Sequence, residues 1–189
     1  MKLPIALSNK HLHLSKADIE TLFGANYELT VKKELSQPGQ YACEEVVDIE
    51  GPKGTLKRVR VLGPARGVTQ IEVSLADARA LGVKAPIRDS GDIDGTPGVK
   101  IIGPKGEVEL EKGVIVAARH IHMHTDDAAK FGVEDKERVK IKTEGQRGLI
   151  FENVLVRVSP SFALEMHVDL EEGNASGVAN GTMVELIKY

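Results

Sequence analysis

The chain has one cysteine, no run of basic residues and no long apolar stretch. Because Cys43 is alone, an internal disulfide is excluded, and a single cysteine is typical of a reducing compartment. No histidine lies near Cys43 in the sequence, so we expect a buried apolar role rather than nucleophilic catalysis. A net charge of −3 and a pI near 6.1 argue against nucleic acid as a partner. The apolar runs are far shorter than the roughly 20 residues of a membrane span, and the opening run is too short for a signal peptide.

Histidine is the residue type with the most informative distribution. Two His-x-His pairs, His11 with His13 and His120 with His122, are accompanied by His124 and His167. Alternate residues of a β-strand point to the same face, so each pair can present two imidazoles in one direction. A metal ion bound through nitrogen requires this arrangement. Surface or capping histidines would explain one pair alone, but two pairs together favour metal binding.

The pairs belong to an internal repeat with a third, divergent copy. An Asp lies five residues after each of His13, Glu72 and His122, and a Gly follows it; these residues are Asp18, Asp77 and Asp127, then Gly24, Gly82 and Gly132. Each copy predicts a strand that ends at a ligand, an N-cap at Ser15, Ser74 or Thr125, and a short helix ended by Gly. We expect the three strand ends to converge. The middle copy has Gln70, a poor zinc ligand, so only its Glu72 is expected to bind.

Short β-branched segments predict a mainly β fold. They lie at residues 59–62, 107–110, 114–116, 139–142, 154–158 and 184–187. Two matching Gly-Pro-Lys-Gly motifs, at 51–54 and 103–106, predict turns, and residues 91–98 predict a surface loop. Many short strands with few helices indicate small barrels or sandwiches.

The candidate ligands are five histidines and Glu72, with His124 left over. They suffice for two metals with three protein ligands each, or for one full site. Three protein ligands leave a coordination position open for water or substrate, which is typical of catalytic zinc. Imidazole with one carboxylate suits zinc, although nickel, cobalt and iron stay open.

The Gly-rich turn 63–69 contains one arginine, Arg66, which lies six residues before Glu72. If the strand prediction holds, Arg66 lies near the metals. A guanidinium beside a metal suits a phosphate or a carboxylate. A surface arginine in a turn is the alternative interpretation.

Three segments, 9–15, 63–74 and 118–123, resemble the PduL-type phosphate acyltransferases, the phosphate propanoyltransferase family. The resemblance runs from about Leu3 to Tyr189. Enzymes of this family interconvert acyl-CoA and phosphate with acyl phosphate and CoA. The resemblance implies two zinc ions per chain, one held by His11, His13 and Glu72, the other by His120, His122 and His167. It implies that Arg66 is the catalytic, phosphate-binding residue and that the CoA site is lined by Leu7, Ser8, Asn9, Lys53, Arg60 and Asn174.

The resemblance also implies the fold: mainly β, with two small β-barrels capped by short α-helices and the metal site between them. The first barrel would combine residues 1–9 with 118–189. The second would comprise 10–117, with a short insertion around 24–44. Some family members carry an N-terminal extension that targets a bacterial microcompartment. Since this chain starts ten residues before His11, we expect it in the cytoplasm, with the microcompartment as the alternative.

The sequence therefore predicts a zinc-dependent phosphate acyltransferase acting on acetyl-CoA or propanoyl-CoA. Phosphate would attack the thioester directly, without a covalent acyl-enzyme. A zinc-dependent thioester hydrolase is the alternative, but hydrolysis would not require Arg66. A non-catalytic zinc-binding module is less favoured, because structural sites normally have four ligands, often Cys. The expected partners are CoA, acyl-CoA, phosphate and acyl phosphate, with no nucleic acid and no membrane; a homodimer stays open.

Overall fold

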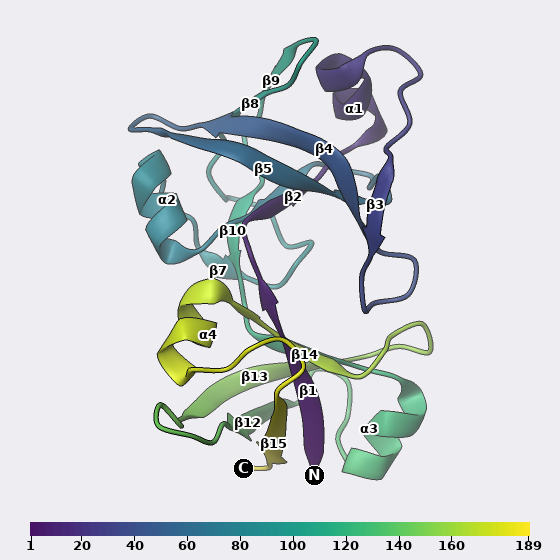
Figure 1. Cartoon of the computed structure of the whole chain (residues 1–189), viewed down its shortest axis with the longest axis vertical. Helices are drawn as coiled ribbons and strands as arrows, with labels where there is room; N and C mark the ends of the chain where they lie inside the picture. Colours follow the sequence, from purple (N-terminus) through teal and green to yellow (C-terminus); the bar gives the residue numbers. More distant parts are fainter. The chain divides into compact units, whose positions relative to one another are not determined.

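The computed structural model describes residues 1–189 and contains fifteen strands and four short helices (Figure 1). The chain divides into two compact units. Unit 1 comprises Met1–Asn9, Ser36–Pro38 and Ala118–Tyr189, and unit 2 comprises Lys10–Leu35 and Gly39–Ala117. The predicted fold class is confirmed, since both units are barrel-like, mainly β and capped by helices. None of the four helices has the length and apolar character needed to span a bilayer.

Unit 1 is a closed six-stranded barrel with the order β1-β14-β11-β13-β12-β15. Its strands are β1 (Lys2–Ser8), β11 (His120–Met123), β12 (Arg138–Lys142), β13 (Ile150–Val158), β14 (Glu165–Asp169) and β15 (Met183–Ile187). Helices α3 (Thr125–Phe131) and α4 (Leu170–Ser176) lie on opposite sides of this barrel in Figure 1. The interior is filled by fully buried apolar side chains, among them Leu3, Ile5, Ile121 and Met166.

Unit 2 is a nine-stranded sheet with the order β7-β10-β6-β2-β5-β4-β8-β9, and β3 pairs with β4. The strands are β2 (His11–His13), β3 (Val31–Glu34), β4 (Tyr41–Glu50), β5 (Thr55–Gly63), β6 (Gln70–Glu72), β7 (Ile87–Arg88), β8 (Lys100–Ile102), β9 (Glu107–Glu109) and β10 (Val114–Ala117). Helices α1 (Lys16–Phe23) and α2 (Leu75–Leu81) pack on it. Its core includes Leu12, Leu14, Ile71 and Leu81, all fully buried.

All six strands predicted from β-branched segments are present, in β5, β9, β10, β12, β13 and β15. In β5 and β12 the side chains alternate, with Val59, Val61, Val139 and Ile141 buried between more exposed residues. The residues 91–98 form a loop, in which Ile93 is buried.

The strand that precedes each His-x-His strand in the chain belongs to the other unit. In the chain β1 directly precedes β2, and β10 directly precedes β11. Yet β1 pairs with β14 and β15 in unit 1, whereas β10 pairs with β6 and β7 in unit 2. Each His-x-His strand therefore follows, after a two-residue link, a strand that belongs to the other unit.

Every helix follows a strand that carries a predicted ligand, and a side chain caps its first turn. Ser15 and Ser74 each accept a hydrogen bond from the backbone N–H three residues on, as predicted. The predicted cap at Thr125 is wrong, because the extended residue before α3 is His124 and its Nδ1 accepts from the Asp126 backbone N–H at 3.1 Å. His124, which the ligand count left over, thus has a structural role.

The repeat has four copies rather than the predicted three. After His167 the chain forms a cap at Asp169, an acid at Glu172 and a left-handed Gly177, at the same spacings as after Glu72. Of the three strands whose ends were predicted to converge, β2 and β6 pair directly in one sheet. The third strand, β11, lies in the barrel of unit 1, where its antiparallel neighbour is β14, the strand of the fourth copy.

The first Gly-Pro-Lys-Gly motif is a hairpin turn that also caps a helix. Gly51 donates to the Gly54 carbonyl at 2.9 Å, and the Lys53 N–H donates to the Leu81 carbonyl at the end of α2 at 3.0 Å. A Cβ on Gly51 would lie 2.3 Å from that carbonyl oxygen. Glycine at this position lets the backbone of the turn approach the end of α2 closely. The turn can then donate a hydrogen bond to a carbonyl that has no partner within the helix.

The second motif does the same for α1. Gly103 donates to the Gly106 carbonyl at 2.9 Å, and the Lys105 N–H donates to the Leu22 carbonyl at 3.0 Å. A Cβ on Gly103 would lie 2.6 Å from the Leu22 oxygen. The predicted pair of turns is confirmed, and the match between the motifs reflects a shared contact with a helix end.

We predict that Gly51→Ala destabilises the protein by about 1–3 kcal/mol, because the added methyl group must displace backbone atoms of α2. Gly67→Ala is the control, since a Cβ there meets no atom within 4 Å. The midpoints of urea unfolding measure the difference. Equal midpoints for the two variants would show that the close turn–helix contact does not constrain the sequence.

Candidate metal centres

In unit 2, β2 and β6 pair antiparallel and place His11 opposite Glu72 and His13 opposite Gln70. Because alternate residues share a face, all four side chains lie on one face of the sheet. The ligand atoms of His11, His13 and Glu72 lie within 4.8 Å of one another, and His11 Nε2 is 3.4 Å from Glu72 Oε2. The structure thus brings together the three residues predicted for the first metal.

Gln70 and Ser90 hold the other oxygen of the Glu72 carboxylate. The Gln70 amide donates to Glu72 Oε1 at 2.7 Å, and the Ser90 hydroxyl donates to the same oxygen at 2.8 Å. The Gly91 N–H in turn donates to Gln70 Oε1 at 2.7 Å, which fixes the amide. Oε2 is therefore the oxygen directed at His11, and the Glu72 carboxylate is arranged to bind a metal as a monodentate ligand.

Arg66 lies in the same network. Its backbone N–H donates to the Leu14 carbonyl at 2.9 Å, beside the end of β2, and Nη1 donates to Ser90 Oγ at 3.4 Å. Its positive charge also lowers the pKa of His13. The guanidinium therefore stands next to the ligand group, where it favours an anion.

His13 is suited to metal binding by its burial. Burial, followed by the charges of His11 and Arg66, lowers the pKa of His13 to about 3. The imidazole is therefore neutral at physiological pH. Its Nδ1 is buried without a hydrogen-bond partner, and a neutral imidazole nitrogen of this kind is a metal ligand.

In unit 1, β11 and β14 pair antiparallel and place His120 opposite His167 and His122 opposite Glu165. The ring centroids lie 4.7 Å apart for His120 and His122, 5.2 Å for His120 and His167, and 4.9 Å for His122 and His167. His120 Nδ1 is 2.8 Å from the Ala118 carbonyl oxygen. That contact leaves Nε2 as its ligand atom, the usual arrangement for a metal-binding histidine.

His122 resembles His13 in its environment. Burial, followed by the charges of His120 and His167, lowers the pKa of His122 to about 2. Its Nδ1 is likewise buried without a hydrogen-bond partner, and the Phe162 ring packs against it with centroids 4.4 Å apart. The second group thus also offers a neutral imidazole.

Glu165 is a polar neighbour of the second group that the sequence did not indicate. Its Oε2 lies 3.3 Å from His167 Nε2 and accepts a hydrogen bond from the Ser36 hydroxyl. Ser36 is held beside β14 because the Gln37 side chain bonds the backbone of Ala163 in both directions. Glu165 occupies the register position that Gln70 occupies in unit 2.

The residues predicted to bind CoA fall into two sets. In unit 1, Leu7 and Ser8 end β1 and Asn9 follows, while Asn174 is exposed on α4, the helix that packs against Leu7 through Gly173. In unit 2, Lys53 is exposed in the turn after β4, and Arg60 Nη1 donates to the carbonyls of Cys43 and Glu44.

Cys43 is fully buried in β4, as predicted. Burial raises the pKa of its thiol to about 12. Because the thiolate is the nucleophilic form, Cys43 is inert at neutral pH.

Comparisons with known proteins cover both ligand groups. A family model for phosphate propanoyltransferase matches residues 4–179. A phosphate propanoyltransferase of Thermotoga maritima is 56% identical over 186 residues, 98% of this chain and 89% of the relative. One of Clostridioides difficile is 55% identical over 184 residues, 97% of this chain and 88% of the relative. One of Salmonella typhimurium is 52% identical over 179 residues, 94% of this chain and 85% of the relative.

The lowered pKa values predict how the metal-free protein responds to pH. In the unfolded chain His13 titrates near 6.5, and in the folded chain near 3, so the unfolded state binds the proton first as the pH falls. Stability should be greatest above pH 6.5 and decline towards pH 3, by about 1.4 kcal/mol per pH unit for each such histidine.

Urea unfolding of chelator-treated protein between pH 7.5 and 5 measures this decline, with His13→Gln as the comparison. The variant should show a shallower decline, because Gln does not titrate. Identical slopes would contradict a neutral, buried His13.

Proposed function

The chain belongs to the phosphate propanoyltransferase family, a family of acyltransferases, and from this membership we propose that it transfers a short acyl group between CoA and phosphate. The substrates would be acetyl-CoA or propanoyl-CoA with phosphate, and the products acyl phosphate and CoA. The proposal depends on one observation: the Arg66 guanidinium lies beside the His11, His13 and Glu72 group. Attack of phosphate on a thioester requires a group that binds the phosphate, and Arg66 can be that group.

Two zinc ions per chain are part of the proposal, one for each ligand group. The close approach of the three ligand atoms in unit 2 supports the first ion. The buried Nδ1 atoms of His13 and His122, which lack hydrogen-bond partners, support an ion in each unit. Imidazole with at most one carboxylate suits zinc. When bound, zinc supplies Lewis-acid charge that can stabilise a developing oxyanion or a departing thiolate.

Arg66 would hold the phosphate for direct attack on the thioester carbon. Its guanidinium can make two parallel hydrogen bonds to a phosphate, and the Ser90 contact limits the orientations that Nη1 can take. Phosphate dianion is a competent nucleophile, so positioning and charge neutralisation suffice. A covalent acyl-enzyme is not required, and the raised pKa of Cys43 argues against a thiol nucleophile.

CoA would bind through Leu7, Ser8, Asn9 and Asn174 in unit 1 and through Lys53 and Arg60 in unit 2. The end of β1 and the exposed face of α4 offer polar groups next to an apolar side chain, Leu7. Lys53 and Arg60 offer positive charge for the phosphates of CoA. The cytoplasmic location stays a prediction of the sequence, with the microcompartment as the alternative, and the sequence leaves the oligomeric state open.

The thioester hydrolase is less favoured, because water needs no cationic anion-binding group. Hydrolysis would therefore not explain why Arg66 contacts Ser90, which itself donates to Glu72. A non-catalytic zinc module is disfavoured by the family membership and by three-ligand groups, since structural zinc normally has four ligands.

We predict that the purified protein holds close to two zinc ions per chain and that His120→Ala loses one of them together with activity. Elemental analysis gives the stoichiometry, and a coupled assay of phosphate-dependent CoA release gives the activity. A single tightly held ion in the fully active wild type would rule out the two-site proposal.

Arg66→Gln should lower phosphate-dependent CoA release at least about 30-fold, because the loss of an uncompensated charged contact costs on the order of 2–5 kcal/mol. Arg66→Lys should recover only a small part, since Lys restores the charge but not the planar fork. Both variants should keep their zinc and their unfolding midpoint. Normal phosphate-dependent turnover in Arg66→Gln would move the assignment towards the hydrolase.

A further inference from the structure

A salt bridge joins the residue before the first histidine pair to the helix after Glu72. Lys10 precedes His11, and Asp77 lies in the first turn of α2, five residues after Glu72. Lys10 Nζ is 3.1 Å from Asp77 Oδ1. The two side chains are 31% and 19% exposed, so this pair is shielded more than an ordinary surface pair.

An equivalent salt bridge occurs in unit 1. Arg119 precedes His120, and Glu172 lies in the first turn of α4, five residues after His167. Arg119 Nε is 2.9 Å from Glu172 Oε1, with side chains 35% and 21% exposed. Burial raises the pKa of the Glu172 carboxyl, and the Arg119 charge lowers it. The Glu172 side chain also accepts from the Asp169 N–H in a capping box, which fixes its position.

The two pairs have the same place in the repeat but different residues. In each unit the basic residue is next to the first histidine of the pair, His11 or His120. The acid follows the ligand that stands directly opposite this histidine, Glu72 or His167. A Lys–Asp and an Arg–Glu pair thus make the same connection, which indicates that the connection itself is what both units require.

The strands that carry the ligands are short, so a salt bridge beside them can help to fix their position. Only three residue pairs join β2 to β6, and only three join β11 to β14. His11 and His120 are each the first residue of their strand, where the hydrogen-bonded ladder ends. A side-chain link at this end can hold the first histidine at a fixed position relative to the ligand opposite.

We propose that Lys10–Asp77 and Arg119–Glu172 are two equivalent positioning clamps, each of which sets the ligand geometry of the metal group in its own unit. The inference rests on the proposed function for the presence of zinc. Neither pair includes a proposed metal ligand or Arg66, so these four residues would act through the ligands beside them. Groups that orient metal ligands typically contribute 10–100-fold to metal affinity.

The test measures zinc affinity of the full chain by competition with a chromophoric chelator, one site at a time. His122→Ala removes a ligand of the unit 1 group, so only the unit 2 group stays intact. His13→Ala removes a ligand of the unit 2 group, so only the unit 1 group stays intact. In the His122→Ala background, Lys10→Met should weaken zinc binding about 10-fold or more. In the His13→Ala background Lys10→Met should have no effect, whereas Arg119→Met should weaken binding there and not in the other background.

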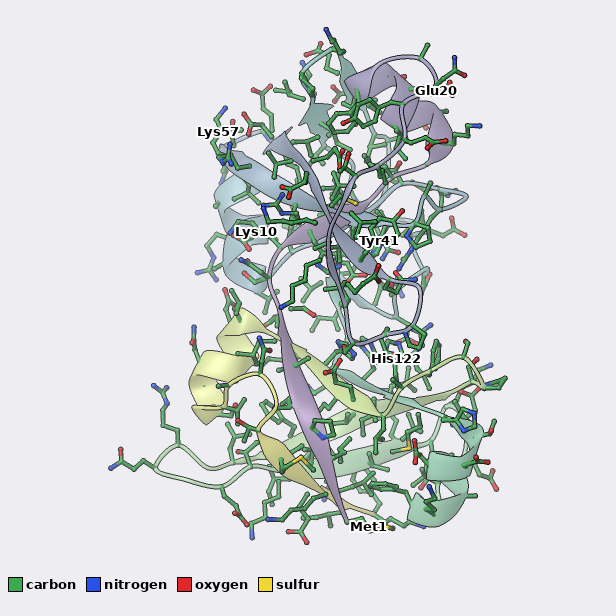
Figure 2. All side chains as sticks on the ribbon, turned by 45° about the vertical axis from the view of Figure 1, so that its right-hand side comes forward. Met1, Lys10, Glu20, Tyr41, Lys57 and His122 are labelled. Atoms are coloured by element: carbon green, nitrogen blue, oxygen red, sulfur yellow. The ribbon has the colours of Figure 1, made fainter.

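Lys57→Met is the matched control, because it removes a Lys–Asp pair of 2.8 Å between β5 and β4 that includes no residue next to a ligand strand in the chain and none of a helix that follows one. The side chain of Lys57 points outward in Figure 2, which also labels Lys10 at the start of β2. This variant should keep both affinities. Lys10→Arg with Asp77→Glu gives the first clamp the residues of the second, and it should retain near-normal affinity for the unit 2 site.

Unchanged affinity in both clamp variants, with two zinc ions still bound by the wild type, would overturn the clamp and leave the proposed function intact. An equal loss at both sites from Lys10→Met would also overturn it, because that result reports general destabilisation. A wild type that binds no zinc would instead refute the metal part of the proposed function.

Discussion

The hydrogen-bond register between short antiparallel strands is the constraint on which both ligand groups depend. In each His-x-His pair the central residue, Leu12 or Ile121, is fully buried in the core of its unit. A slip of one residue would turn the imidazoles into the apolar core and that apolar side chain onto the ligand face, because strand side chains alternate between faces. The apolar core therefore determines the register, and the register determines which side chains stand opposite the histidines. Packing and ligand geometry are in this way specified by the same three-residue segments.

The four strand-to-helix corners explain how one local design serves two ligand groups. In each unit, a corner with a His-x-His strand stands antiparallel to a corner with a single ligand, Glu72 or His167. The residue opposite the second histidine, Gln70 or Glu165, then touches that single ligand. Different chemistry results from equivalent positions: Gln70 donates to a carboxylate, whereas Glu165 faces an imidazole. The repeat thus conserves geometry while the donor set of each group differs.

Much of the fold was predictable because its signals are local. Alternating β-branched residues, the caps at Ser15 and Ser74, and the glycine turns each depend on a few neighbouring residues. The shared face of His11 and His13 was predictable because spacing along a strand decides it, whereas their grouping with Glu72 rested on the family resemblance. Ser90 was not predictable, since it reaches Glu72 from a loop eighteen residues further on and no local pattern indicates this. The fourth copy was missed because its cap is Asp169 and its ligand a lone histidine, so its sequence differs although its spacings agree.

The buried imidazoles create a conflict that folding alone does not resolve. His13 and His122 each bury a nitrogen without a hydrogen-bond partner, and such a group costs about 1–3 kcal/mol. Against a typical total stability of roughly 5–15 kcal/mol this is a substantial loss. A ligand that binds only the folded chain returns free energy in proportion to the logarithm of its concentration over its dissociation constant. Since the nitrogens that weaken the apolar packing are those a metal would coordinate, occupancy of these groups and stability of the fold should be thermodynamically linked, and each unit carries its own share of that linkage.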